Sequence, residues 1–265
     1  MINMPLKLLS QPVTTISGLR HPCSLFYSQG KVLATEMYQN QIIEIDSQHR
    51  IQEVLLFIGV NKVTQDADLN FYVTTIGDHK LHKVSNDGSI IKTVGCFGTG
   101  NAEFNHPNGL RVSKTHELYV CDSGNNRIQV FDLDLNFKRT FGRKGTGKGQ
   151  FDFPSDVDFD SSGNIYIADC QNDRIQVFTS SECHIRIIQN QICSPIKLHN
   201  PVSLLMHDNH IYVTNCSEHN VVVIDMSGQI ISTFGDGYLN YPEGITVDKD
   251  GFIYVTSHQS SVIVF

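Results

Sequence analysis

Two groups of side chains in this sequence have the chemistry to bind a ligand: a run of cations and a set of histidines. The cations gather between Phe137 and Phe151, where no acidic residue occurs, and basic side chains on loops bind phosphates. The formal net charge of the whole chain is −7, which argues against a uniformly basic protein that binds polyanions without specificity. The five cations are Lys138, Arg139, Arg143, Lys144 and Lys148.

Histidine is the second group, with 12 residues in the chain, and imidazole is a common ligand of zinc. His21 and His106 each stand directly before a proline, at a position that recurs along the chain. The corresponding positions further on hold Phe153, Asn200 and Tyr241, so these positions form no ring of three histidines. The sequence also lacks an HExxH pattern and any spacing typical of a catalytic triad. We therefore expect no metal, no cofactor and no catalytic residue.

The sequence is built from repeats. The stretch LYVCDSGNNRIQVF at 118–131 returns as IYIADCQNDRIQVF at 165–178. The position of the tyrosine in this stretch marks six units along the chain. A period of roughly 40 residues with strand-like patterning inside each unit is the sequence signature of a β-propeller. The marking residues are Leu33, Tyr72, Tyr119, Tyr166, Tyr212 and Tyr254.

The fourth unit shows what each unit is expected to build. A short strand at 155–159 leads into a turn at 160–164, and further strands follow at 165–168, 174–178 and 185–188. The turn contains Asp, Ser, Gly and Asn, which form tight turns through local hydrogen bonds and positive φ angles. Each unit is thus expected to be a four-stranded antiparallel sheet, and residues 1–265 a single all-β domain, a six-bladed β-propeller. Because the last unit is one strand short, we expect the N-terminal segment Val13–Ile16 to supply that strand and close the last blade.

The topology of such a blade divides its loops between two faces. The loops between second and third strands, together with the links between blades, emerge on one face, which is rich in aromatic, basic and amide side chains. We expect ligands to dock on this face, with cations on phosphates and with aromatic or amide groups on bases or on a protein surface. The candidate binding residues are Tyr38, His79, Lys80, Asn126, Arg127, Arg143, Lys144, Lys148, Asn172, Arg174 and Tyr241.

Two of these candidates, Arg127 and Arg174, also have a structural explanation. Each occurs together with the aspartate that ends the second strand of its unit, Asp122 or Asp169, and units five and six lack both residues. An ion pair between the two would fix the loop inside the blade. The paired occurrence favours this structural role, and the neighbouring asparagines are expected mainly to form turns.

The cysteines bear on the compartment. The chain has seven of them, an odd number, and no two show CxxC spacing. This pattern favours reduced thiols, so we expect a cytoplasmic protein. No apolar stretch approaches the ~18 residues of a membrane span, and the N-terminal apolar run is too short for a secretory signal. We expect no membrane association.

The stretches HPNGLRVSKTHELYVCDSGNNRIQVF and FPSDVDFDSSGNIYIADCQNDRIQVF, with FGRKGTGKGQF between them, strongly resemble the NHL repeat. The resemblance is close in units three and four and extends more loosely along the whole chain. NHL repeats form six-bladed propellers and are best known in animals from the C-terminal region of tripartite-motif (TRIM) E3 ubiquitin ligases, where they bind RNA or proteins. This sequence has none of the Cys/His spacing of a RING finger or B-box, so ligase chemistry cannot reside in it.

The residues and the resemblance together predict a recognition module and not an enzyme. The expected partners are proteins, with single-stranded RNA as a second class of ligand, and the expected role is substrate recognition for a TRIM-type ligase. No small-molecule substrate is expected. Two alternatives stay open: a free-standing protein scaffold without RNA binding, and a metal-dependent propeller hydrolase or lyase with its metal at the mouth of the channel.

Overall fold

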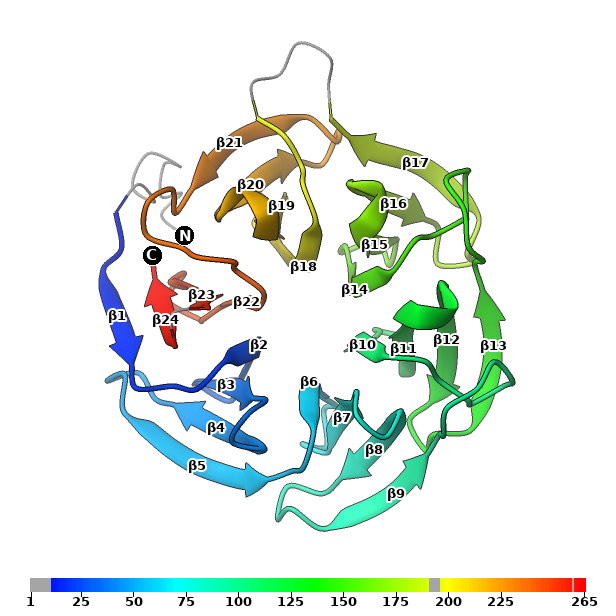
Figure 1. Ribbon diagram of the computed structural model, residues 1–265, viewed down its shortest axis with the longest axis horizontal. Helices are drawn as coiled ribbons and strands as arrows, with labels where there is room; N and C mark the ends of the chain where they lie inside the picture. The colour runs from blue at the N-terminus through cyan, green and yellow to red at the C-terminus, as the bar shows by residue number, and fades with distance from the viewer. Residues whose placement is uncertain (1–10, 191–195, 259) are drawn as a thin grey trace.

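The computed structural model describes residues 11–190, 196–258 and 260–265. Six four-stranded antiparallel sheets stand radially around a central axis (Figure 1). This arrangement confirms the predicted six-bladed β-propeller. Within the described ranges, no helix is long and apolar enough to cross a membrane.

Five of the blades are each built from four consecutive strands, with the first strand innermost and the fourth outermost (Figure 1). Blade one contains β2 (Pro22–Ser28), β3 (Lys31–Glu36), β4 (Gln41–Ile45) and β5 (Ile51–Leu56), and blade two contains β6 (Val60–Gln65), β7 (Phe71–Thr75), β8 (Lys80–Val84) and β9 (Ile90–Val94). Blade three contains β10 (Pro107–Val112), β11 (Glu117–Asp122), β12 (Arg127–Asp132) and β13 (Phe137–Phe141). Blade four contains β14 (Pro154–Phe159), β15 (Ile165–Asp169), β16 (Arg174–Phe178) and β17 (His184–Gln189), and blade five contains β18 (Pro201–His207), β19 (His210–Asn215), β20 (Asn220–Asp225) and β21 (Ile230–Phe234).

Blade six combines strands from opposite ends of the chain. Its first three strands are β22 (Ile245–Val247), β23 (Ile253–Ser257) and β24 (Ser261–Val264), and its outermost strand is β1 (Thr14–Ser17). β1 pairs antiparallel with β24, with Thr14 opposite Val264 and Ser17 opposite Ser261. This pairing confirms the predicted closing strand. It also covers a sheet edge that would otherwise expose unpaired N–H and C=O groups.

The hydrophobic core lies between the blades. Between blades three and four, for example, Tyr119 packs in one cluster with Val157, Ile167 and Phe178, and each of these side chains is at most 2% exposed. A similar cluster fills each of the other five interfaces. A single small sheet buries too little apolar surface to be stable in water, so each blade depends on its two neighbours.

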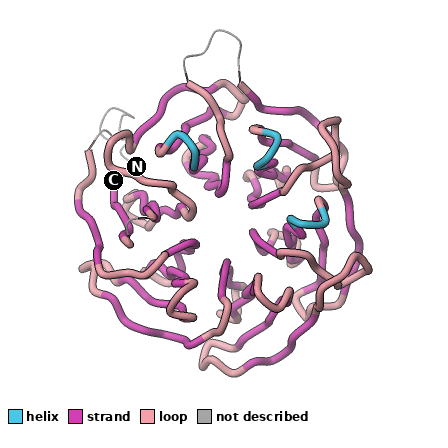
Figure 2. Tube along the Cα trace, in the orientation of Figure 1, coloured by secondary structure: helices cyan, strands magenta, loops and turns pink. Residues whose placement is uncertain are grey.

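The loop between the second and third strand of a blade has a recurring geometry. In blades three, four and five it contains one turn of 3₁₀ helix, namely η2 (Ser123–Asn125), η3 (Cys170–Asn172) and η4 (Cys216–Glu218) (Figure 2). Each turn is followed by a residue in the left-handed conformation: Asn126, Asp173 or His219. Asn, Asp and His are the non-glycine residues most often found there.

This left-handed loop residue fastens each blade to the next one. Its side chain accepts a hydrogen bond from the backbone N–H of a residue at the start of the next blade, and we call this contact the interblade bond. Among the described residues it occurs at five of the six interfaces. The pairs are Gly59 N to Asn40 Oδ1 (2.8 Å), His106 N to His79 Nδ1 (3.1 Å), Phe153 N to Asn126 Oδ1 (2.9 Å), Asn200 N to Asp173 Oδ1 (2.8 Å) and Tyr241 N to His219 Nδ1 (2.9 Å).

Candidate functional site

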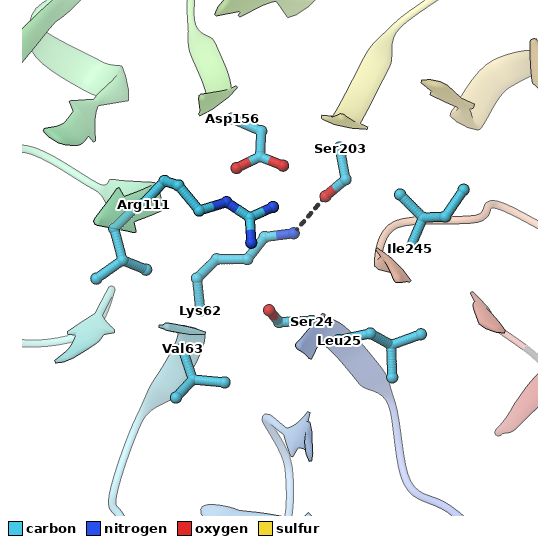
Figure 3. A pocket seen from close by; sticks show the side chains of 9 residues that line it. Ser24, Leu25, Lys62, Val63, Arg111, Asp156, Ser203 and Ile245 are labelled. Atoms are coloured by element: carbon cyan, nitrogen blue, oxygen red, sulfur yellow. Dashed lines mark hydrogen bonds between the residues drawn. The ribbon is translucent and has the colours of Figure 1, made fainter. Parts of the chain in front are cut away.

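The first strands of all six blades line a channel on the propeller axis, and charged side chains fill its interior (Figure 3). Lys62 on β6 is 5% exposed. Its ammonium donates to Ser203 Oγ at 2.8 Å and to the Cys23 carbonyl at 3.2 Å. The cavity that remains measures about 20 Å³, which holds about one water molecule. The channel interior is therefore too full to admit a substrate.

Two buried carboxylates balance the cations of the channel. Asp156 and Asp158 are each 8% exposed and accept hydrogen bonds from backbone N–H groups of β18 at 3.0 Å. Arg111 Nε lies 3.2 Å from Asp158 Oδ1. Burial raises the pKa of Asp158, and the Arg111 charge opposes that rise. Because these contacts join β10, β14 and β18, we assign the carboxylates to the stability of the ring.

The buried cysteines near the axis are not nucleophiles. Burial raises the pKa of the Cys23 thiol to about 11, that of Cys216 to about 11 and that of Cys170 to about 12. A nucleophilic cysteine reacts as its thiolate, and these three groups are protonated at neutral pH. All six cysteines in the described ranges are free thiols, as the sequence predicted.

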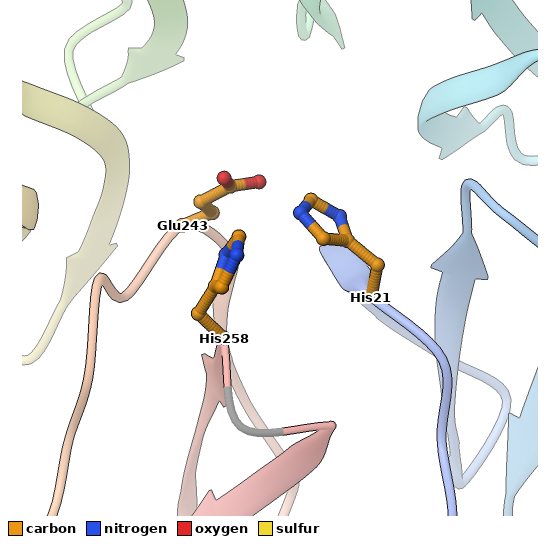
Figure 4. Close-up of side chains that lie close together, drawn as sticks. All are labelled: His21, Glu243 and His258. Atoms are coloured by element: carbon orange, nitrogen blue, oxygen red, sulfur yellow. The ribbon is translucent and has the colours of Figure 1, made fainter.

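Three side chains with metal-binding atoms come together where the ring closes (Figure 4). His21, Glu243 and His258 each offer one ligand atom, and these atoms all lie within 4.8 Å of one another. His21 and Glu243 are partly buried, whereas His258 is exposed. The group is therefore open to solvent on one side, at a mouth of the channel.

Blade one and blade six position this group together. His21 directly precedes β2, Glu243 lies just before β22, and His258 directly follows β23. Within blade six, the backbone N–H of His258 donates to the Asn240 carbonyl at 2.7 Å. The backbone N–H of Glu243 donates to Thr256 Oγ1 at 3.2 Å. The carboxylate and the exposed imidazole thus stand on backbone that is itself hydrogen-bonded.

The His21 ring carries a polar atom without a partner. Its Nδ1 is buried and has no hydrogen-bond partner among the described residues, although buried polar atoms are nearly always paired. Two imidazoles and one carboxylate are a common ligand set for catalytic Zn²⁺ and for related transition metals. Two donor atoms bound to one Zn²⁺ lie roughly 3.4 Å apart, so side-chain rotations that move each atom by about 1 Å would complete the site. The residues fit a divalent cation.

Exposed aromatic rings flank this group. The ring centroid of His21 lies 4.7 Å from that of Tyr38 and 4.5 Å from that of His258. Tyr241 lies 6.0 Å from His258 and 4.3 Å from His219. Tyr38 is 71% exposed and Tyr241 is 49% exposed, so both offer apolar surface on which a flat part of a ligand can stack.

Arg127 and Arg174 make the structural ion pairs predicted from the sequence. Nε of each donates to the aspartate at the end of the second strand, Asp122 or Asp169, at 2.7 Å. The arginine side chains are 13% and 6% exposed. Their remaining N–H groups donate to backbone carbonyls of the link that enters the same blade. Both guanidinium groups are thus committed within the fold.

Four other candidate residues also have partners within the fold. Asn126 and His79 accept interblade bonds. The Asn172 amide donates to both oxygens of Asp169, at 3.1 and 3.0 Å. Lys80 forms an ion pair with Asp78 at 3.0 Å. Asn126, His79 and Asn172 therefore help to hold their loops, whereas the Lys80 pair is exposed and contributes little.

The basic link between β13 and β14 remains exposed, at Arg143, Lys144 and Lys148. The Lys144 ammonium lies 3.9 Å from the Asp152 carboxylate. These cations belong to the link between blades three and four, across the ring from blades six and one, which carry His21 and His258 (Figure 1). The structure does not bring the two groups together, and a ligand-binding role for the cations stays a prediction.

Sequence reasoning missed Glu243 and His258 as partners of His21. It compared residues at equivalent positions of the repeats, whereas the two partners occupy positions that are not equivalent to that of His21. The signal that could have found them is the closing strand. Once β1 is paired with β24, the loop that carries His258 has to lie beside the segment that carries His21.

The NHL repeat family matches residues 104–131 and 151–178, which contain β10 to β12 and β14 to β16. The match identifies the repeat and does not extend to a tripartite-motif context. No curated protein shows significant sequence similarity to the chain.

Solved propellers match the structure over most of its length. A streptogramin B lyase superimposes with a TM-score of 0.71 at 16% identity, covering 95% of this chain and 96% of that one. A gluconolactonase from Xanthomonas campestris gives a TM-score of 0.74 at 11% identity, covering 98% and 93%. A virginiamycin B lyase from Staphylococcus aureus, a catalytically inactive histidine-to-alanine variant with quinupristin, gives 0.67 at 15% identity, covering 92% and 79%. At these identities the likeness establishes the fold.

These neighbours contradict the function predicted from the sequence. The predicted recognition module had no catalytic role, took no small-molecule substrate and served a TRIM-type ligase. The three neighbours described above are enzymes that process small molecules, so this interpretation is corrected and is not retained. The physical reason is that a propeller brings loops of distant repeats together at one channel mouth, which spacing within a repeat does not reveal. The chain is a six-bladed β-propeller that carries NHL repeats.

Proposed function

We propose that this protein is a metal-dependent hydrolase or lyase that acts on a small molecule at the mouth of the propeller channel. The observation that carries the proposal is the convergence of His21, Glu243 and His258, with ligand atoms within 4.8 Å of one another. The small-molecule enzymes among the structural neighbours support it. The ligase context is not part of the proposal, because the family match identifies the NHL repeat alone.

The two imidazoles and the carboxylate would hold a divalent cation such as Zn²⁺ or Mn²⁺. A cation held there would polarise a substrate carbonyl and would lower the pKa of a bound water to about 7. Glu243 supplies a negative charge that favours a cation over a neutral ligand. Because the channel interior is filled around Lys62, the substrate has to approach from the solvent side, past His258.

The rings beside the site suggest how a substrate is held. Tyr38 and Tyr241 are exposed on either side of the imidazoles, and each would bury an apolar part of the substrate. A carboxylic ester or lactone combines such a part with a carbonyl oxygen that binds a hard cation. Hydrolysis adds water across the acyl C–O bond and yields an acid and an alcohol. Elimination instead breaks the alkyl C–O bond, removes a proton from the carbon next to that alkyl carbon, and yields an alkene and an acid.

The test is catalysis on a panel of small carboxylic esters and lactones, before and after chelation with EDTA. We expect removal of the cation to lower kcat/KM by roughly 100-fold, as for loss of a few kcal/mol of carbonyl polarisation. Added Zn²⁺ or Mn²⁺ should restore the activity. Glu243→Gln and His258→Ala should lose activity to a similar extent, with an unchanged circular dichroism spectrum.

A matched control uses the histidine of blade three. His106 occupies the same prolyl position as His21 but lies beside His79, far from the carboxylate of Glu243 in the ring. His106→Asn should therefore leave kcat/KM unchanged. The proposal fails if the wild-type protein converts none of the esters with any added cation, or if Glu243→Gln keeps full activity.

A further inference from the structure

We infer that the cation at His21, Glu243 and His258 also closes the propeller ring, as a cross-link between the first and the last blade. The inference rests on the proposed function for the presence of a cation. It goes further by giving that cation a structural role, with a readout that is independent of catalysis.

The three ligands come from segments that are far apart in the chain. His21 lies on the segment that connects β1 to β2, whereas Glu243 and His258 flank β22 and β23. Roughly 220 residues separate His21 from Glu243, and metal clips that close long loops are expected to restrict the unfolded chain most. One bound cation would tie the start of blade one to blade six and so enclose the other blades between its ligands.

The remaining contacts at this closure are all noncovalent. β1 and β24 pair through four residue positions, from Thr14 to Ser17. Ile16, Leu19 and Tyr254 belong to the apolar cluster between blades six and one. The backbone N–H of Leu19 donates to the Ser260 carbonyl at 3.2 Å. The closure is thus held by a four-residue strand pairing and one apolar cluster, where a further link would have a measurable effect.

His21 occupies the position at which the other interfaces have their interblade bond. At the other five interfaces, an interblade bond reaches a residue with positive φ at the start of the next blade. His21, with φ 56°, occupies that position in blade one, just as His106 (52°) and Asn200 (56°) do in blades three and five. The metal-binding group therefore stands where the other interfaces have their interblade bond, and a cation there would fasten the sixth interface.

The backbone already holds the two blades at the right distance. A Cβ atom on Gly244 would lie 2.9 Å from Leu25 N and 3.0 Å from Ser24 Cα, closer than real Cβ contacts. Only glycine allows this approach. Glu243, the next residue, is consequently kept beside blade one without a cation, and the ligands need only small rotations to bind one.

Hydrogen exchange measured by mass spectrometry tests the inference directly. The protein is freed of metal with EDTA, and exchange is followed with and without free Zn²⁺ at 100 times its dissociation constant. At that ratio, an opening that releases the cation is suppressed about 100-fold. We expect slowing of this order in peptides that cover β1, β2, β23 and β24. Peptides of blades three and four should show no such slowing at early times.

A pair of matched variants identifies the ligand responsible. His21→Asn should fold normally, because Asn200 adopts the same backbone conformation at the equivalent position. It should abolish the Zn²⁺-dependent slowing while leaving metal-free exchange rates within about twofold of wild type, since the Nδ1 atom that is removed has no hydrogen-bond partner among the described residues. His106→Asn makes the same chemical change in blade three and should keep the full Zn²⁺ effect.

The outcomes separate this inference from the proposed function. Zn²⁺ binding, measured by calorimetry, without slowing at β1 and β24 overturns the cross-link and leaves the catalytic proposal standing. Slowing at β1 and β24 without activity on any ester supports the cross-link and overturns the catalytic proposal. Absence of binding of both Zn²⁺ and Mn²⁺ overturns both. Equal slowing in His21→Asn and in wild type would place the cation elsewhere and overturn the cross-link.

Discussion

At the scale of single residues, Arg174 illustrates how the repeat uses a charged side chain. Its guanidinium pairs with Asp169 at 2.7 Å and donates to the carbonyls of Gly147 and Gln150 at 3.0 and 2.8 Å. The aspartate is 0% exposed. The ion pair was predictable because Asp and Arg occur together in units three and four. The carbonyl partners were not, since they depend on the path of a glycine-rich link.

Replacing Arg174 with alanine should destabilise the fold strongly. Asp169 would remain buried without its cation, and removing one partner of a buried ion pair costs about 3 kcal/mol or more. Asn172 and Gln176 still donate to this carboxylate and offset part of that cost. We expect the free energy of unfolding to fall by about 3 kcal/mol, measured by urea denaturation.

The control for Arg174→Ala is Arg143→Ala in the link before the same blade. Arg143 is exposed, and exposed substitutions usually change stability by less than about 0.5 kcal/mol. A fully stable Arg174→Ala protein would contradict the structural role and return this arginine to the list of ligand-binding candidates.

At the scale of elements, the tight turn between the first and second strands of a blade was predicted better than the loop between its second and third strands. The turn after β14 follows its sequence: the backbone N–H groups of Ser162 and Asn164 both donate to Asp160 Oδ1 at 2.9 Å. Such local hydrogen bonding is encoded within five residues. The 3₁₀ turns η2 to η4 and the interblade bonds were not predicted. The interblade bonds depend on the neighbouring blade, and a single repeat does not contain that information.

The ion-pair partners of the cations on the outer strand β13 were also not predictable from the sequence. In the sequence, Lys138 and Arg139 belong to a run of cations without an acid. In the structure, Arg139 donates to both oxygens of Glu117 at 2.8 Å and to Glu182 of blade four at 2.6 Å. Lys138 also pairs with Glu117. Part of the apparent positive patch is therefore neutralised by acids that lie more than 20 residues away.

This cluster predicts a specific dependence of stability on pH. The Arg139 hydrogen bonds hold the pKa of Glu117 at about 2, below its ordinary value of 4.5. A carboxyl group with a depressed folded-state pKa contributes stability above its unfolded pKa and loses it as the pH falls. The melting temperature should therefore decline between pH 4.5 and 2, and Glu117→Gln should make that decline shallower.

Asp250→Asn provides the comparison for Glu117→Gln. Its carboxylate pairs with Lys249, but both side chains are more than half exposed, at 54% and 66%, and exposed pairs contribute little. The acid decline should match wild type in this variant. An identical decline in Glu117→Gln and wild type would show that the β13 cluster does not stabilise the fold.

At the scale of the whole molecule, the period of the repeat predicted the ring and its closure. Each sheet alone is unstable in water, so repeats that match in pattern have to stack, and an incomplete last unit has to find its fourth strand. The candidate site was not predictable in the same way. His21, Glu243 and His258 meet only because the ring closes, and no pair of them occupies equivalent positions in two units.

The closing strand can be tested by one substitution. Ile16 on β1 is 5% exposed and packs in the cluster between blades six and one. Ile16→Ala should cost about 3 kcal/mol, as for other buried isoleucines, which corresponds to a fall of roughly 6–12 °C in melting temperature. Thr15→Ala on the same strand should have little effect because Thr15 is exposed. Equal melting temperatures for Ile16→Ala and wild type would mean that β1 does not hold the ring closed.

The pairing of β1 with β24 also has a consequence for synthesis on the ribosome. Thr14 pairs with Val264, so the strand made first waits for the strand made last. At the usual elongation rates of about 5–20 residues per second, that delay is roughly 10–50 s. Blades one to five have their own strands complete before then and can stack as they emerge. During this interval β1 has no partner strand, so its unpaired N–H and C=O groups are exposed to pairing with other chains.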